Sequence, residues 1–210
     1  MHRPFRVSLL LIAFTQFISC STGRSIHGLE LRSAQRPAVT IRVEPGFRYL
    51  GRFSFVLGSA FEGERYVFVD AEGKSLRRLF IVQFERVRRS SPEIYRYSFE
   101  RGERIGSMLF IQNCFAFPGA QTIAADAHDE GTMTNNFLIS RGFQNPPLWL
   151  AARFVTLGAS DRKSEMIIFY MERNDHFALA DLNAGDEPTP AWLQMKPEVL
   201  ARARATFTLE

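Results

Sequence analysis

Apolar and polar residues alternate along much of the first half of the chain, which is the pattern of strands with one buried face. The segment 39–43 shows it most simply, because valine and isoleucine occupy every second position. Aromatic and β-branched residues support the same interpretation elsewhere. The sequence therefore predicts strands over 39–43, 48–57, 65–69, 76–87, 94–99 and 105–117.

Two of these strands are predicted to form a hairpin. Residues 65–69 lead into the short polar loop 70–74, and residues 76–87 return as a long apolar strand. Gly73 stands near the end of the loop, where short hairpins need a residue that tolerates a positive φ.

The second half of the chain contains the predicted helices. Residues 122–142 are expected to form one, with Thr122 as its N-cap and Gly142 closing it, although Gly131 lies inside. The other expected elements are strands over 148–157 and 165–171, a short helix over 175–182 and a final helix opened by Pro197.

Strands followed by helices, without regular alternation, are typical of an α+β fold. We expect a curved, mostly antiparallel sheet packed against one central helix and one or two C-terminal helices. Such a sheet can curve around a helix or close partly into a barrel, and the sequence leaves both arrangements open.

The first 20 residues have the organisation of a secretory signal. His2, Arg3 and Arg6 make a basic start, an apolar run follows over 7–18, and small and polar residues come next. A transmembrane helix needs about 20 apolar residues, so this run is too short to remain in a bilayer. A buried N-terminal helix is the alternative, but the run lacks the amphipathic stripe of such a helix.

The segment 17–20 (Phe-Ile-Ser-Cys) resembles the lipobox of bacterial lipoproteins, in which a cysteine follows a short apolar and small-residue tripeptide. Phe17 departs from that pattern, which usually has leucine there. The resemblance implies that Cys20 becomes the lipid-modified first residue of the mature chain and that its acyl chains hold the protein on a membrane. The alternative is cleavage nearby, for example after Ser21 or Gly23, which would release a soluble protein.

The expected organisation is a signal over 1–20, a polar linker over 21–36 and a single α+β domain over 37–210. If Cys20 is lipidated, Cys114 is alone, and its apolar neighbours predict a buried, inert thiol. If Cys20 is not lipidated, a disulfide between Cys20 and Cys114 is open in an oxidising compartment.

The charge of the mature chain is modest. Without Arg3 and Arg6 the formal net charge falls from +4 to +2. The densest basic run, 86–89, has Glu85 and Glu93 close by, as a solvated strand end would. We therefore expect no nucleic-acid partner.

The chain contains no phosphate-binding loop, dinucleotide fingerprint, zincin, thioredoxin-like or hydrolase-elbow motif. Its densest polar cluster includes Asp126, His128 and Glu130. On the expected helix Asp126 and Glu130 share a face and could act as paired carboxylates. The alternative is acidic residues favoured by the dipole at a helix N-terminus. A metal needs three convergent ligands and the pair supplies two, so we expect no metal and no cofactor.

A second weak candidate is His176. It follows Asp175, which is expected to cap the short helix. The alternative is an ordinary surface histidine.

Two functions remain open. The 20 phenylalanines and five tyrosines could line a curved sheet that encloses an apolar ligand, or could fill its core. We expect an exported, membrane-tethered, non-enzymatic protein that binds an apolar ligand or a protein partner, on the periplasmic face of a membrane or secreted. The alternative is an envelope hydrolase that uses Asp126, His128 or His176.

Overall fold

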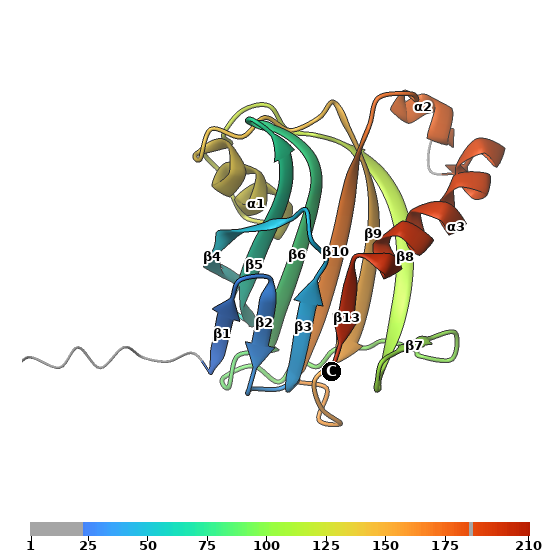
Figure 1. The fold of residues 1–210 in the computed structure, drawn as a ribbon. Coiled ribbons are helices and arrows are strands. Elements are labelled where there is room, and N and C mark those ends of the chain that lie inside the picture. Colours follow the sequence, from blue (N-terminus) through green and yellow to red (C-terminus); the bar gives the residue numbers. More distant parts are fainter. Residues whose placement is uncertain (1–22, 185–186) are drawn as a thin grey trace, which may run out of the picture.

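The computed structural model describes residues 23–184 and 187–210, so the expected signal, including Cys20, lies outside the described residues. Nearly half of the described residues form two antiparallel sheets (Figure 1). In spatial order, the larger sheet contains β4 (Arg48–Leu57), β5 (Phe61–Glu72), β6 (Ser75–Val87), β10 (Ser164–Asn174), β9 (Leu148–Leu157), β8 (Met108–Pro118) and β7 (Glu103–Ile105). The smaller contains β1 (Arg24–His27), β2 (Glu30–Ser33), β3 (Val39–Val43) and β13 (Phe207–Leu209).

Helices are few among the described residues. They are α1 (Glu130–Ile139), α2 (Leu179–Leu182) and α3 (Pro190–Ala205), and a short ladder joins β11 (Asn183–Ala184) to β12 (Glu187–Pro188). The protein is therefore β-rich, and the expected α+β class is met only in part.

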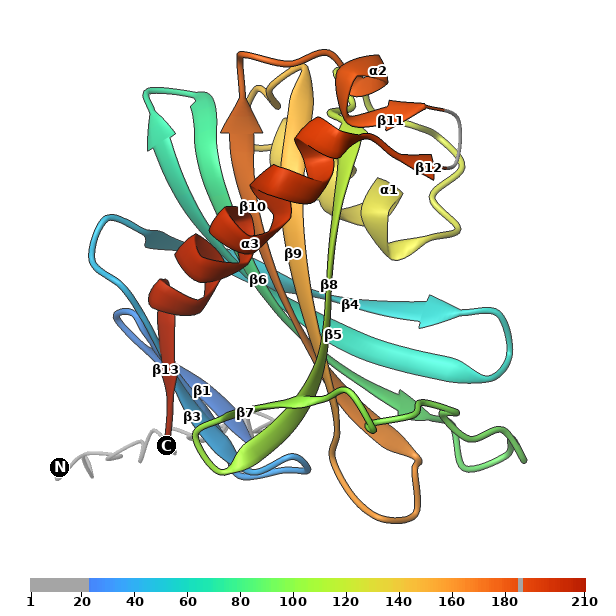
Figure 2. The same ribbon diagram turned by 90° about the vertical axis from the view of Figure 1, so that its right-hand side faces the viewer.

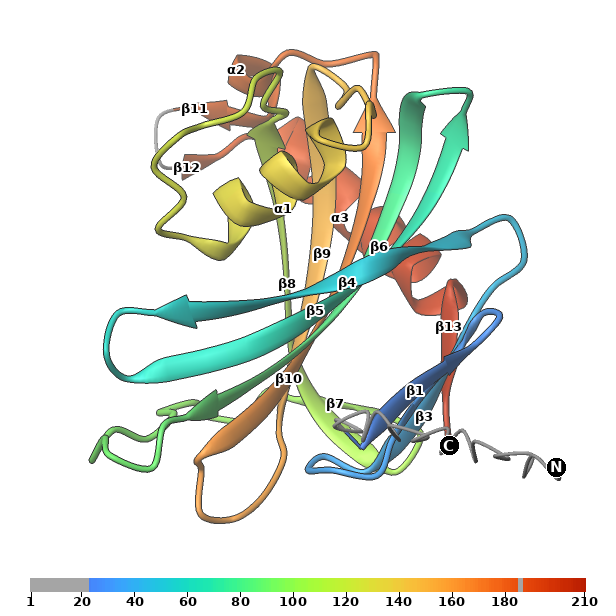
Figure 3. The same cartoon turned by 90° about the vertical axis from the view of Figure 1, so that its left-hand side faces the viewer.

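The large sheet separates two apolar cores. Figure 3 shows α1 in front of this sheet and α3 behind it. Phe137 and Leu138 of α1 pack in one core, and Trp192 and Val199 of α3 pack in the other, which lies between the two sheets. Figure 2 shows α3 crossing the side of the large sheet that faces the smaller one.

Aromatic rings fill much of this second core. The ring of Phe80 lies 5.6–6.2 Å, centroid to centroid, from the rings of Phe47, Phe68 and Phe207. Such tilted and edge-to-face pairs stabilise a core beyond the area that they bury. These rings therefore fill the core, which is one of the two roles that the sequence left open for the aromatic residues.

The predicted hairpin is confirmed. β5 and β6 pair out to Glu72 and Ser75, so Gly73 and Lys74 form the turn between them. Gly73 has a φ of 59°, in the left-handed region that glycine enters without a steric penalty. The expected strands over 39–43, 48–57 and 148–157 are also confirmed, each with the predicted bounds.

Two expectations about strands and linkers are wrong. Residues 24–33 form the hairpin β1–β2 and not a linker, because they bond to each other and, through β2, to β3. Conversely, residues 94–99 form no strand. Their alternating side chains contact polar groups of the large sheet, as described below.

The helix boundaries also differ from the sequence predictions. α1 begins at Glu130 and not near Thr122, because Asp129 caps it by accepting a hydrogen bond from the Thr132 amide. α3 begins at Pro190, with Thr189 as its N-cap. Pro197 therefore lies inside a helix that it was expected to open.

Candidate functional site

The structure separates the residues of the predicted acidic cluster. Asp126 and His128 precede α1, and their side chains are 88% and 84% exposed. They contact each other, with 2.9 Å between His128 Nε2 and Asp126 Oδ1. Because Asp126 is not on the helix, the expectation that it shares a helix face with Glu130 is wrong.

Glu130 instead faces the large sheet. Its backbone oxygen accepts a hydrogen bond of 2.6 Å from Arg65 Nη1, and its Oε1 atom lies 3.4 Å from Gln83 Nε2. The start of α1 is thus fixed to β5 and β6, and the Glu130 carboxylate belongs to a different group of residues from Asp126 and His128.

His176 lies in the exposed turn after β10. Its amide donates to Asn174 Oδ1 at 3.3 Å, which shapes the turn. Asp175 forms an ion pair of 2.7 Å with Arg173 and does not cap α2, which begins only at Leu179. No contact in the described chain joins His176 to Asp126 or His128.

A buried polar group that the sequence patterns do not predict lies on the α1 side of the large sheet. We call it the carboxylate cluster, and it consists of Arg65, Gln83, Glu85 and Glu165, which are all buried. Glu85 and Glu165 stand directly opposite each other on β6 and β10. Gln83 Nε2 donates to Glu85 Oε2 at 2.9 Å and Arg65 Nε donates to Gln83 Oε1 at 2.6 Å.

The pKa values of the two glutamates of this cluster are both raised above that of an exposed glutamate. Burial, followed by the neighbouring charge of Glu85, raises the pKa of Glu165 to about 7. Burial likewise raises the pKa of Glu85, and the charge of Glu130 adds to this. Two negative charges in one buried site destabilise each other, and this repulsion adds to the effect of burial on the pKa of each glutamate.

Residues 92–99 cover this cluster. Tyr95 Oη donates to Glu85 Oε1 at 2.7 Å, and Tyr97 is hydrogen-bonded to Glu165. Arg162 holds the backbone of this segment, with bonds of 2.6 Å to the Tyr95 oxygen and 2.8 Å to the Tyr97 oxygen. The alternating tyrosines that predicted a strand therefore bind side chains of the sheet.

Arg65 is the buried cation of the cluster. Burial lowers its pKa to about 10, although the charges of Glu130 and Glu85 act in the opposite direction. Its guanidinium also lies 5.2 Å from the centre of the Phe169 ring and donates to Thr134 of α1. It therefore links the sheet to α1.

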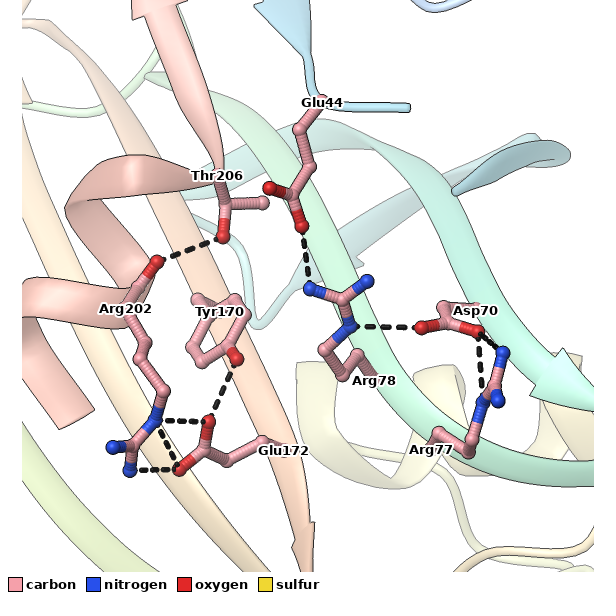
Figure 4. A network of polar contacts seen from close by, with 8 residues as sticks. All are labelled: Glu44, Asp70, Arg77, Arg78, Tyr170, Glu172, Arg202 and Thr206. Atoms are coloured by element: carbon pink, nitrogen blue, oxygen red, sulfur yellow. Dashed lines mark hydrogen bonds and ion pairs between the residues drawn. The ribbon is translucent and has the colours of Figure 1, made fainter. Parts of the chain in front are cut away.

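A second polar network lies toward the smaller sheet (Figure 4). Asp70 accepts hydrogen bonds from Arg77 and Arg78, and Arg78 also binds Glu44 in the β3–β4 connection. Burial acts to raise the pKa of Asp70, but the two arginine bonds outweigh it and hold that pKa below its ordinary value. Glu172 similarly joins Tyr170 to Arg202 of α3. These bonds connect the β3–β4 connection, β5 and β6 on one side of the network, and β10 and α3 on the other.

A hollow of about 290 Å³ opens where β8, β9 and β10 meet the start of α2. Its apolar lining comprises Pro118, Pro147, Leu148, Phe177, Ala178 and Leu179. Asn174 and Asp175 supply its polar lining. Phe177 and Leu179 are also among the large apolar side chains that the described residues expose.

Cys114 is buried and forms no disulfide with a described residue. Burial raises the pKa of its thiol to about 12, so its nucleophilic thiolate is scarce at neutral pH. This environment agrees with the prediction that Cys114 is a buried, unreactive thiol.

Within residues 23–184 and 187–210, no three His, Cys, Asp or Glu side chains are grouped to hold a metal ion. No helix in these residues is long and apolar enough to cross a bilayer. Comparisons of the chain with protein families, curated proteins and solved structures find no match.

Proposed function

We propose that this protein is exported, anchored to a membrane through Cys20, and binds a small apolar group without catalysis in the hollow beside α2. The hollow is the observation that carries the binding part of the proposal. The anchoring part rests on the order of basic, apolar and small residues over 1–20 and on the lipobox-like segment.

The size of the hollow suits a small apolar ligand. Its 290 Å³ is close to the lower limit of about 300 Å³ for small-molecule sites. A cavity of about 150 Å³ is enough for benzene, so one or two rings or a short alkyl chain can enter. Six apolar residues in the wall with two polar ones match the composition of such sites.

Local hydrogen bonds support a preformed wall. Asn174 Nδ2 donates to the Phe177 backbone oxygen at 2.8 Å. Asp181 Oδ2 accepts from the Ala178 amide at 2.8 Å. Because these bonds fix the turn before a ligand arrives, little conformational entropy is lost on binding.

The hydrolase alternative lacks a converging set of groups. It requires at least two of the candidate side chains to meet in a concave pocket. Asp126 and His128 contact each other on the exposed surface, and Glu130 turns toward Gln83. The carboxylate cluster does not replace them, because Tyr95 and its segment cover it.

Binding is tested with the chain from Ser21 to Glu210, purified without detergent, and the apolar dye N-phenyl-1-naphthylamine. We expect saturable fluorescence enhancement with one dye per chain. Ala178→Phe fills the hollow and should weaken dye binding at least tenfold. Ala34→Phe, at an exposed position in the turn before β3, is the matched control and should bind as the unmodified chain does. The absence of saturation, or equal binding by both variants, would refute the site.

Anchoring is tested by intact mass spectrometry of the protein expressed in a bacterial host. An acylated chain beginning at Cys20, absent when Cys20→Ala is expressed, supports the anchor. An unmodified mature mass overturns it, without affecting the dye result.

A further inference from the structure

The folded domain begins almost immediately after Cys20. Only Ser21 and Thr22 lie between this cysteine and Gly23, and the Gly23 backbone oxygen accepts a hydrogen bond of 2.8 Å from the Ala34 amide. Consecutive Cα atoms are about 3.8 Å apart, so three steps place the Cys20 Cα within about 11 Å of the Gly23 Cα. A tether of this length leaves no room for the domain to stand away from the membrane.

Three segments form the end of the molecule near Gly23, and we call them together the basic end: residues 34–38, 88–102 and 158–163. Figures 1 and 2 both show them at the lower end of the molecule, where β1 and β3 lie. Arg36 lies 3.8 Å from Asp161, and Lys163 Nζ donates to the Ser91 oxygen at 2.9 Å. These contacts hold the segments together as one surface.

This end carries an excess of positive charge. It contains seven arginine or lysine residues and three acidic residues, whereas the whole mature chain carries about two more positive than negative charges. The acidic residues are Glu93, Glu100 and Asp161. The basic side chains that are exposed are Arg36, Arg88, Arg89, Arg96 and Arg101. The rest of the mature chain is therefore slightly acidic.

We infer that the basic end lies against the surface of an anionic phospholipid bilayer and that the hollow beside α2 points away from it. The inference rests on the proposed anchor at Cys20. Basic side chains are attracted to anionic headgroups over about a Debye length, roughly 8 Å at physiological salt, which the short tether allows them to reach. In Figures 1 and 2, α2 lies at the upper end of the molecule and β1 at the lower end, so this orientation presents the hollow to the aqueous side.

The test places a fluorophore at either end of the acylated protein in a Cys114→Ala background. Ser90→Cys carries it at the basic end, and Glu72→Cys carries it at the β5–β6 turn as the matched control, since both positions are exposed. The protein is reconstituted into vesicles with 30% phosphatidylglycerol and a lipid that bears a nitroxide quencher on its headgroup. We expect at least threefold stronger quenching at position 90 than at position 72, and equal quenching would overturn the orientation.

A spacer variant separates the tether from the charge. Twenty Gly and Ser residues inserted between Thr22 and Gly23 give the domain a reach of about 25 Å. In neutral phosphatidylcholine vesicles, quenching at position 90 should then fall to that at position 72. In anionic vesicles, quenching at position 90 should stay higher than quenching at position 72. Equal quenching at the two positions in anionic vesicles would refute the role of the arginines.

The failure of this inference differs from the failure of the proposed anchor. Intact mass of the reconstituted sample shows whether Cys20 is acylated. An acylated protein with equal quenching at both positions overturns only the orientation, whereas a protein without acylation overturns the anchor and the inference that rests on it.

Discussion

Replacing Glu165 with glutamine tests the carboxylate cluster directly. The side chain is only 2% exposed, and its pKa of about 7 lies well above the ordinary value of 4.5. Between pH 4.5 and about pH 7, the Glu165 carboxyl is therefore mostly protonated in the folded protein and mostly ionised in the unfolded chain. Because the native state binds more protons in this range, the free energy of unfolding falls as the pH rises from about 4.5 to about 7.

The magnitude follows from the size of the pKa shift. A shift of one unit corresponds to about 1.4 kcal/mol. Because the pKa of Glu165 rises from 4.5 to about 7 on folding, the free energy of unfolding should be about 3 kcal/mol lower at pH 8 than at pH 4. Glu165→Gln removes this ionisation but keeps an amide that can bond to Tyr97. We expect the variant to be about 3 kcal/mol more stable than the unmodified protein at pH 8 and close to it at pH 4.

The assay is urea unfolding at intervals between pH 4 and pH 8, followed by tryptophan fluorescence. Trp149 and Trp192 are both buried, so their emission reports loss of both cores. Glu103→Gln is the matched control, because Glu103 forms an exposed ion pair with Arg204. Such pairs contribute little, so its pH profile should follow that of the unmodified protein.

The decisive comparison is how the free energy of unfolding changes with pH in the unmodified protein and in Glu165→Gln. If the unmodified protein loses no more stability between pH 5 and pH 8 than Glu165→Gln does, the reasoning about burial and the charge of Glu85 is wrong.

Three further outcomes are expected. Arg65→Ala should lower the free energy of unfolding by about 3 kcal/mol in urea titrations. The substitution leaves Gln83 and the Glu130 backbone oxygen without their buried hydrogen-bond donor. A loss below about 1 kcal/mol would contradict this. Gly63→Ala should cost about 1–3 kcal/mol in the same assay, because a Cβ would lie 2.7 Å from the Phe84 backbone oxygen, and an unchanged midpoint would refute the predicted clash. Cys114 should react with iodoacetamide at pH 8 about a thousandfold more slowly in the folded protein than in urea, since its pKa rises from 9.0 to about 12; similar rates would show that the thiol is accessible.

Local patterns in the sequence were sufficient for most strands. The alternation over 39–43 and the turn glycine at position 73 report which side of the backbone is buried and where it must reverse. These properties depend on a few neighbouring residues, so the β5–β6 hairpin and three strands have the predicted positions.

Helix starts depended on competition between several possible caps. Thr122 and Asp129 are both acceptable N-cap residues, and the pattern over 122–142 predicts a start at the first. The structure uses Asp129, because Glu130 and Thr134 then meet Arg65 on the sheet. The choice was thus made by a contact with a residue far away in the chain.

The sequence contains one signal of the carboxylate cluster. Gln83 and Glu85 follow Ile81 at every second position of a predicted strand, on the face that also carries the apolar residues Leu79 and Val87. Polar residues on such a face must have buried partners. The sequence showed no partner, because Glu165 and Arg65 come from other strands.

The sequence by itself determined where the chain is extended, where the first hairpin turns and that residues 1–20 resemble an export signal. Only the tertiary structure decided that Glu85 faces Glu165, that the tyrosines of 92–99 cover them and that residues 24–33 form a hairpin. The physical reason is that burial alternation is a local property, whereas strand register and side-chain partners depend on the whole sheet.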